Sequence, residues 1–203
     1  MKTNMTILFL LFSFTIFGQG NCFEDYKKNS ERYDSLKLDS NGKFNIRKAN
    51  EVKDKIINGF VGCKIPDFIV KTIDGKTLST SDLNCKVIVL NFWFEACSPC
   101  VAEIPDLNKL VIEYKDSNAV FIAFSADDSL TIKKFLQRKE FIYELVSSTY
   151  DMKEKFCLIG GYPTSMIFDG KGILRYIFCY RLIEGEKSFE IFKQTIDKYL
   201  KEI

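Results

Sequence analysis

The apolar residues of this chain follow two patterns. Two runs, 87–94 and 120–125, are almost continuously apolar, which predicts strands buried on both faces of a sheet. Elsewhere apolar residues recur every three or four positions, and this spacing predicts helices from about residue 101 to 114, from 129 to 137, near 150–156 and from 189 to 200. Strands that alternate with helices predict an α/β domain.

Turn residues predict two hairpins in the same region. Segments 65–71 and 76–79 are joined by Asp74-Gly75, and segments 165–168 and 173–180 are joined by Asp169-Gly-Lys-Gly. Residues 21–61 are more polar and predict only one helix, at 47–57. Pro105 lies inside the helix that follows the first buried strand, where it removes one backbone hydrogen bond and predicts a kink.

The N-terminus predicts export. Residues 5–18 are nearly all apolar or small, and as a helix they would span about 21 Å, short of the roughly 30 Å of a membrane core. Gly18 and Gly20 suit a cut before Asn21. We therefore expect a signal peptide at 1–20, an extension at 21–61 and a domain at 62–203, in a periplasmic or secreted protein. A membrane tether or a buried N-terminal helix is the alternative.

Composition narrows the chemistry. The chain has 203 residues, seven cysteines and no histidine, so triads and metal sites that need imidazole are excluded. Lys and Arg number 29 against 27 Asp and Glu, which gives no field that would attract nucleic acid. We expect no nucleic-acid partner.

The sequence Cys97-Ser-Pro-Cys100 lies where the first buried strand ends and a helix begins. Backbone N–H groups and the helix dipole at such a position favour a thiolate. Cys97 is the expected nucleophile towards a disulfide, and Cys100 is the expected resolving thiol. Half of a zinc site and a static structural disulfide are the alternatives. Zinc would need further Cys or His ligands, and with no second C-x-x-C and no histidine we expect no metal.

The sequence V-I-V-L-N-F-W-F-E-A-C-S-P-C-V-A-E-I-P, followed by G-Y-P-T at 161–164, resembles the thioredoxin-like fold in its exported TlpA/ResA branch. The resemblance implies a central mixed β-sheet flanked by helices, with an N-terminal β-hairpin and a short N-terminal extension. It implies a thiol-disulfide oxidoreductase that needs no cofactor and reduces or isomerises disulfides in exported proteins. An upstream membrane thiol donor and a role in cytochrome c maturation are implied by the same analogy.

The resemblance also implies the roles of further residues. Pro163 matches the cis-proline beside the disulfide, with Tyr162 and Thr164 on the same substrate-binding loop, and Trp93 matches an aromatic residue of the incoming strand. Glu103 matches an acidic residue that tunes the thiols. From the residues alone, desolvation beside apolar neighbours would raise the Glu103 pKa and make it an acid or base. An exposed first-turn glutamate is the alternative for Glu103, and a core position is the alternative for Trp93.

Four departures from the family pattern bear on function. Ala96 stands where a Trp commonly precedes the first cysteine, and Val101 stands where a Lys or Arg is usual. Asn91 stands where thioredoxins proper carry a buried aspartate, so a buried carboxylate near the pair would have to be Glu103. The Ser-Pro dipeptide at 98–99 lacks the histidine of strongly oxidising relatives, which favours a reductant or isomerase.

The other cysteines suggest two bridges. The numbers of Cys63 and Cys85 sum to nearly the value expected for facing residues of the first hairpin, so a disulfide across its base is a hypothesis. Cys157 and Cys179 form a weaker candidate pair near the proline loop, with two buried thiols as the alternative. Cys22 is then unpaired.

Two competing classes remain at this stage. One is a thioredoxin-fold binding module whose C-x-x-C is a static disulfide. The other is a peroxidase on a related scaffold, which would need Pro and Thr upstream of its reactive cysteine, and these are not found before Cys97.

Overall fold

The computed structural model of the chain describes residues 22–28, 34–35, 37–147, 150–179 and 186–203. The predicted signal peptide at 1–20 lies outside the described residues. Within those residues, no helix combines the length and the apolar character needed to cross a membrane.

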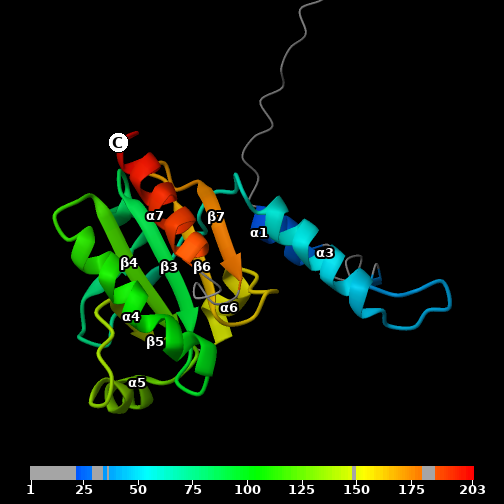
Figure 1. Ribbon diagram of the computed structural model, residues 1–203, viewed down its shortest axis with the longest axis horizontal. Coiled ribbons are helices and arrows are strands. Elements are labelled where there is room, and N and C mark those ends of the chain that lie inside the picture. The colour runs from blue at the N-terminus through cyan, green and yellow to red at the C-terminus, as the bar shows by residue number, and fades with distance from the viewer. Residues whose placement is uncertain (1–21, 29–33, 36, 148–149, 180–185) are drawn as a thin grey trace, which may run out of the picture.

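A five-stranded mixed sheet forms the centre of the molecule (Figure 1), as the resemblance implied. The strand order is β5-β4-β3-β6-β7, with β3 in the middle. β3 pairs in parallel with β4 and in antiparallel with β6, and all seven of its residues are buried, as its continuous apolar run predicts. The bounds are β3 Val87–Trp93, β4 Ala119–Ser125, β5 Glu144–Ser147, β6 Thr164–Phe168 and β7 Leu174–Cys179.

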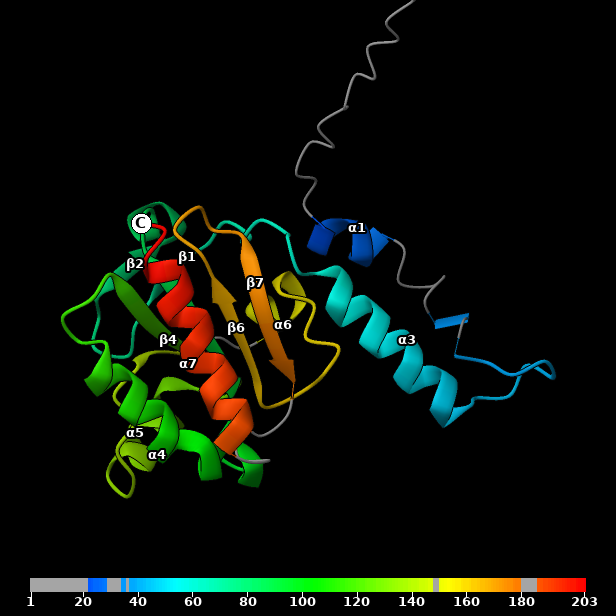
Figure 2. The same ribbon diagram turned by 45° about the horizontal axis from the view of Figure 1, so that its top comes forward.

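Helices cover both faces of this sheet. Figures 1 and 2 show α4, Ser98–Glu113, and α7, Glu186–Leu200, side by side on one face. α5, Ser129–Leu136, has Asp128 as its N-cap residue, whose carboxylate accepts the N–H of Thr131 at 2.7 Å. The short α6, Tyr150–Lys155, contributes Met152 to the apolar cluster on the opposite face.

The first predicted hairpin is confirmed but is short. β1, Ile69–Lys71, pairs in antiparallel with β2, Thr77–Ser79, and Gly75 takes the positive φ of 91° that the turn requires. A 3₁₀ turn, η1 at Thr80–Leu83, follows β2 directly.

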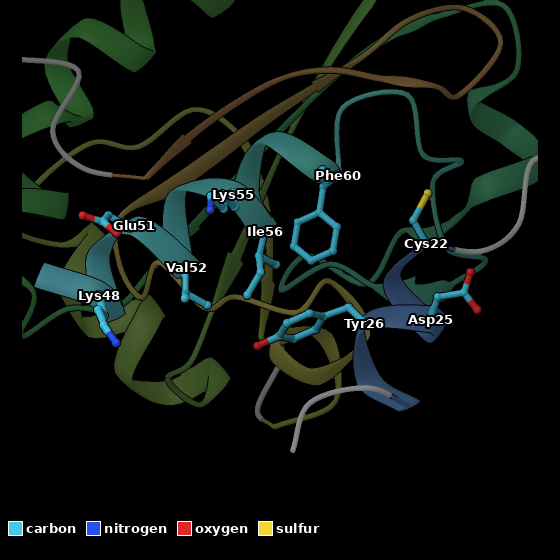
Figure 3. A pocket seen from close by; sticks show the side chains of 10 residues that line it. Cys22, Asp25, Tyr26, Lys48, Glu51, Val52, Lys55, Ile56 and Phe60 are labelled. Atoms are coloured by element: carbon cyan, nitrogen blue, oxygen red, sulfur yellow. The ribbon is translucent and has the colours of Figure 1, made fainter. Parts of the chain in front are cut away.

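The N-terminal extension packs against the domain through aromatic rings. The predicted helix at 47–57 is α3, Ile46–Gly59, and α1, Cys22–Lys28, lies against its C-terminal end. The ring of Phe23 stacks on Phe60 at 4.8 Å and meets Phe156 of the domain edge to face at 5.9 Å. Figure 3 shows the pocket between α1 and α3, which has a volume of ≈ 590 Å³.

The predicted disulfide between Cys63 and Cys85 is wrong. Cys63 bonds to Cys22, across 41 positions of sequence, and Cys85 is an exposed thiol outside the disulfides. The hairpin register does sum to 148, since Ile69 faces Ser79. However, pairing stops at these residues and the chain turns into η1, so the ladder never reaches the two cysteines.

The predicted pair of Cys157 and Cys179 is also wrong, because both lie outside the disulfides. The Cys157 thiol donates to the carbonyl of Phe23 in α1 at 3.3 Å. Cys179 faces Thr164 across β6 and β7, and a bulge between Ile167 and Phe168 shifts the register of this pairing by one residue. The alternative of two thiols buried in the core is the correct one.

Candidate active site

The Cys97–Cys100 pair lies at the start of α4 and is a disulfide in the structure. Cys97 is the N-cap residue, and its Sγ accepts the backbone N–H of Cys100 at 3.3 Å. Cys97 retains 6 % exposure against 1 % for Cys100, and Ala96 beside it is exposed. The N-terminal sulfur is therefore both nearer to solvent and nearer to the helix donors, as an attacking thiolate requires.

The loop expected beside the pair has the expected form. The Tyr162–Pro163 peptide bond is cis. Pro163 is buried, and Thr164 is buried with its hydroxyl donating to the carbonyl of Gly161 at 2.7 Å. The Thr164 hydroxyl thus stabilises the bend of this loop, and Tyr162 next to the proline is half-buried.

An aromatic pair joins this loop to the redox pair. The ring of Phe94 meets Tyr162 edge to face at 5.2 Å, and its carbonyl accepts the N–H of Cys97 at 3.1 Å. Burial raises the pKa of Tyr162, and the nearby Asp127 carboxylate raises it further. Sequence reasoning missed Phe94. Its position at the end of the apolar run, three residues before Cys97, was the available signal.

Trp93 lies in the core and not in a groove. Its ring is 1 % exposed and packs against Phe135 at 5.1 Å and Phe141 at 5.3 Å. The alternative that Trp93 is a core residue fits the structure, and a direct contact with a client does not. Trp93 is the last residue of β3, and Phe94 follows it directly in the chain.

Glu103 is buried, so the alternative of an exposed first-turn glutamate is wrong. It is 1 % exposed, and its Oε1 accepts a hydrogen bond from the Asn91 side-chain amide at 2.9 Å. The same amide nitrogen donates to the hydroxyl of Ser165 at 3.0 Å. α4, β3 and β6 therefore meet at one buried polar cluster, on the face of α4 that also buries Cys100.

Residues 139–142 form hydrogen bonds with α4. The Nζ of Lys139 donates to the carbonyl of Val101 at 2.6 Å, and the Asn108 side chain both donates to the carbonyl of Glu140 and accepts the N–H of Ile142, each at 3.0 Å. Sequence reasoning missed this connection, since nothing local to the segment predicts it. Among the described residues no group of three or more His, Cys, Asp or Glu is arranged to hold a metal ion.

Comparison with known proteins identifies the class. The family model described as the AhpC/TSA family matches residues 61–177, and the chain belongs to this thioredoxin-like family. Within it, the chain is a thiol-disulfide oxidoreductase, and its partners are thiol-disulfide redox partners.

Particular relatives support this assignment. The thiol-disulfide oxidoreductase ResA of Bacillus anthracis is 31 % identical over 149 residues, which cover 70 % of this chain and 78 % of ResA. The thioredoxin-like protein YneN of Bacillus subtilis is 32 % identical over 119 residues, 57 % of this chain and 69 % of YneN. A crystal structure of a thiol:disulfide interchange protein from Chlorobium tepidum superposes with a TM-score of 0.58 at 24 % identity, covering 68 % of this chain and 97 % of that one, which shows the shared fold.

Proposed function

We propose that this protein reduces or isomerises disulfides in other exported proteins through a dithiol–disulfide cycle of Cys97 and Cys100. The observation that carries the proposal is the disulfide at the N-cap of α4, with its outer sulfur hydrogen-bonded to a helix N–H and next to the exposed Ala96. The division into signal peptide 1–20, extension 21–61 and domain 62–203 is part of this proposal.

The cycle begins from the reduced pair. The Cys97 thiolate attacks one sulfur of a client disulfide, so that a mixed disulfide forms and the other client sulfur leaves as a thiolate. The Cys100 thiolate then attacks Sγ of Cys97, which forms the observed Cys97–Cys100 disulfide and releases the second client thiol. The client gains two electrons and two protons, and the enzyme loses them. In isomerisation the released client thiolate attacks another client disulfide. The client thiolate freed by that attack then attacks the client sulfur of the mixed disulfide, so a new client disulfide forms and Cys97 leaves as a thiolate.

Glu103 is the proposed proton carrier of the second step. Cys100 is 1 % exposed and must lose its proton before it attacks. Glu103 is the buried carboxylate one helical turn further along α4, and its position is fixed by Asn91. Tyr162 and Pro163 are the proposed contacts for the client backbone and side chains, with Phe94 as the second aromatic ring.

Location and partners follow from the apolar N-terminus and from the family. We infer export to the periplasm or secretion, with regeneration of the dithiol by an upstream membrane thiol donor. An apocytochrome c that must be kept reduced before haem attachment is one client class, by analogy with the branch that the motif resembles.

The test is a redox titration followed by trapping. The Cys97–Cys100 pair of the mature protein is equilibrated in dithiol buffers, and Cys100→Ser is then incubated with oxidised exported proteins. A mixed disulfide on Cys97 that Cys97→Ser abolishes is expected. Cys85→Ser is the matched control, because it removes an exposed thiol and leaves trapping unchanged. A pair that does not cycle, or a Cys100→Ser variant that traps nothing, would leave a static disulfide and contradict the proposal.

A further inference from the structure

Pro105 leaves one carbonyl of the active-site helix without its helical partner. In an α-helix the carbonyl of Val101 accepts the N–H of the residue four positions later, and here that residue is a proline. Val101 directly follows Cys100, and its own N–H donates to the carbonyl of Cys97 at 3.0 Å. The missing bond therefore lies in the turn that directly follows the redox pair.

Lys139 supplies the missing donor from a different element. Its ammonium nitrogen lies 2.6 Å from the carbonyl oxygen of Val101, and the backbone N–H of Lys139 donates to the carbonyl of Phe135 at 3.1 Å. The two hydrogen bonds of Asn108 hold the segment that follows. A half-buried positive charge is thus bound to the carbonyl of the residue that follows Cys100 in the chain.

We propose that Lys139 is a positioning residue of the redox centre, placed by the carbonyl that Pro105 leaves open, and that its charge stabilises the thiolate of the reduced pair. The inference rests on the proposed function of Cys97 and Cys100. It also accounts for Val101, which stands where the family pattern has a cation: the positive charge reaches the same turn from outside the helix. A charged donor to a carbonyl forms a shorter and stronger bond than a neutral one, so the ammonium is well held.

Other ionisable groups lie on the elements that neighbour the pair. Glu103 lies on α4 itself, Glu95 precedes α4 and pairs with Arg138, and Asp127 follows β4 and accepts the N–H of Glu95 at 2.6 Å. Tyr162, on the proline loop, stays neutral because its pKa is raised. Negative charges on these carboxylates disfavour a thiolate, whereas the positive charge of Lys139 favours it.

The sign of the effect follows from charge. A nearby cation favours the thiolate and hence the reduced state of the pair. Its removal should make the pair a stronger reductant and should shift the pH profile of Cys97 alkylation to higher pH. We expect Lys139→Met to change the equilibrium constant with glutathione by about 5-fold, which is about 20 mV for a two-electron couple.

The experiment measures the redox equilibrium and the rate of iodoacetamide alkylation of the fully reduced protein as a function of pH. Lys139→Arg keeps the charge and should behave as the parent. Lys133→Met is the matched control, since it removes an exposed lysine from α5. Pro105→Ala restores the helical N–H and should weaken the hold on Lys139, so Lys139→Met should have a smaller effect in that background than in the parent.

Each outcome decides the inference. A parent-like equilibrium and alkylation profile for Lys139→Met, with unfolding showing that the variant is folded, overturns it. Equal shifts in Lys139→Met and Lys133→Met overturn it as well, because any nearby charge would then suffice. Additive effects of Pro105→Ala and Lys139→Met overturn the placement by Pro105. Alkylation is measured without a client, so a failure of the proposed function, seen as the absence of client trapping by Cys100→Ser, is distinguishable from these results.

Discussion

Removal of the Cys22–Cys63 disulfide gives the most direct test of how the extension is held. The bond closes a loop with a sequence separation of 41. In the chain-entropy model a 15-residue loop is worth about 3 kcal/mol and a 100-residue loop about 4.7, so this loop contributes about 4 kcal/mol to the free energy of unfolding. The seven residues of α1 are too few to form a stable helix alone, so its docking depends on this bond and on the aromatic contacts of Phe23.

We expect the double variant Cys22→Ser/Cys63→Ser to lose that stability as one cooperative unit. Phe23 and Phe60 belong to the same apolar cluster as Phe92 and Phe124 of the sheet, so the extension and the domain should unfold together. At roughly 2–4 °C per kcal/mol for a chain of this size, Tm should fall by about 8–16 °C.

The measurement is calorimetry together with guanidinium titration followed by circular dichroism, with the Cys97–Cys100 pair kept oxidised throughout. Cys85→Ser is the control, because its exposed thiol should leave Tm within about 1 °C of the parent. An unchanged Tm in the double variant would refute the loop-closure argument. Two separate transitions would refute the shared core, since the extension would then unfold by itself.

Three further predictions concern buried polar groups and thiols. Asn91→Asp places a second carboxylate beside Glu103, and repulsion between like charges raises the pKa of the two carboxyl groups. The free energy of unfolding of the variant should therefore fall by about 1–3 kcal/mol at pH 7 and recover as the pH falls. Urea titrations at pH 5 and 7 measure this difference. Burial raises the pKa of Cys179, so mass spectrometry after iodoacetamide at pH 8 should find Cys85 labelled at least about tenfold faster, and equal rates would contradict this burial. Burial and the hydrogen bond to Asp197 raise the pKa of Tyr114 in the folded protein. The stability of the parent should therefore fall above about pH 10, where the tyrosine ionises in the unfolded chain. Tyr114→Phe should lack this pH-dependent loss and should be about 1–2 kcal/mol less stable than the parent at pH 7.

Local signals in the sequence were sufficient for most elements. The continuous apolar run of β3 and the turn residues of both hairpins predicted structure correctly, because burial on two faces and a positive φ each require particular residue types at one place. β5 was missed because only two of its four residues are buried and its pairing with β4 makes it a strand. The C-x-x-C motif at a strand-to-helix junction predicted the redox pair, and the cis-proline came from the resemblance.

Contacts between distant segments required the tertiary structure. The sequence by itself determined that two of the seven cysteines form a C-x-x-C motif. The disulfide partner of Cys63 depends on where α1 docks, because that places Cys22 beside it. The hairpin that suggested Cys85 as the partner is too short to bring Cys85 close to Cys63. Glu103 can be buried because the side-chain amide of Asn91, on β3, donates a hydrogen bond to its carboxylate. Pro105 in the sequence predicted a missing helical hydrogen bond, and the tertiary structure shows that a lysine 34 positions later supplies the donor. A hydrogen bond between separate elements depends on their relative placement, so it leaves no local pattern in the sequence.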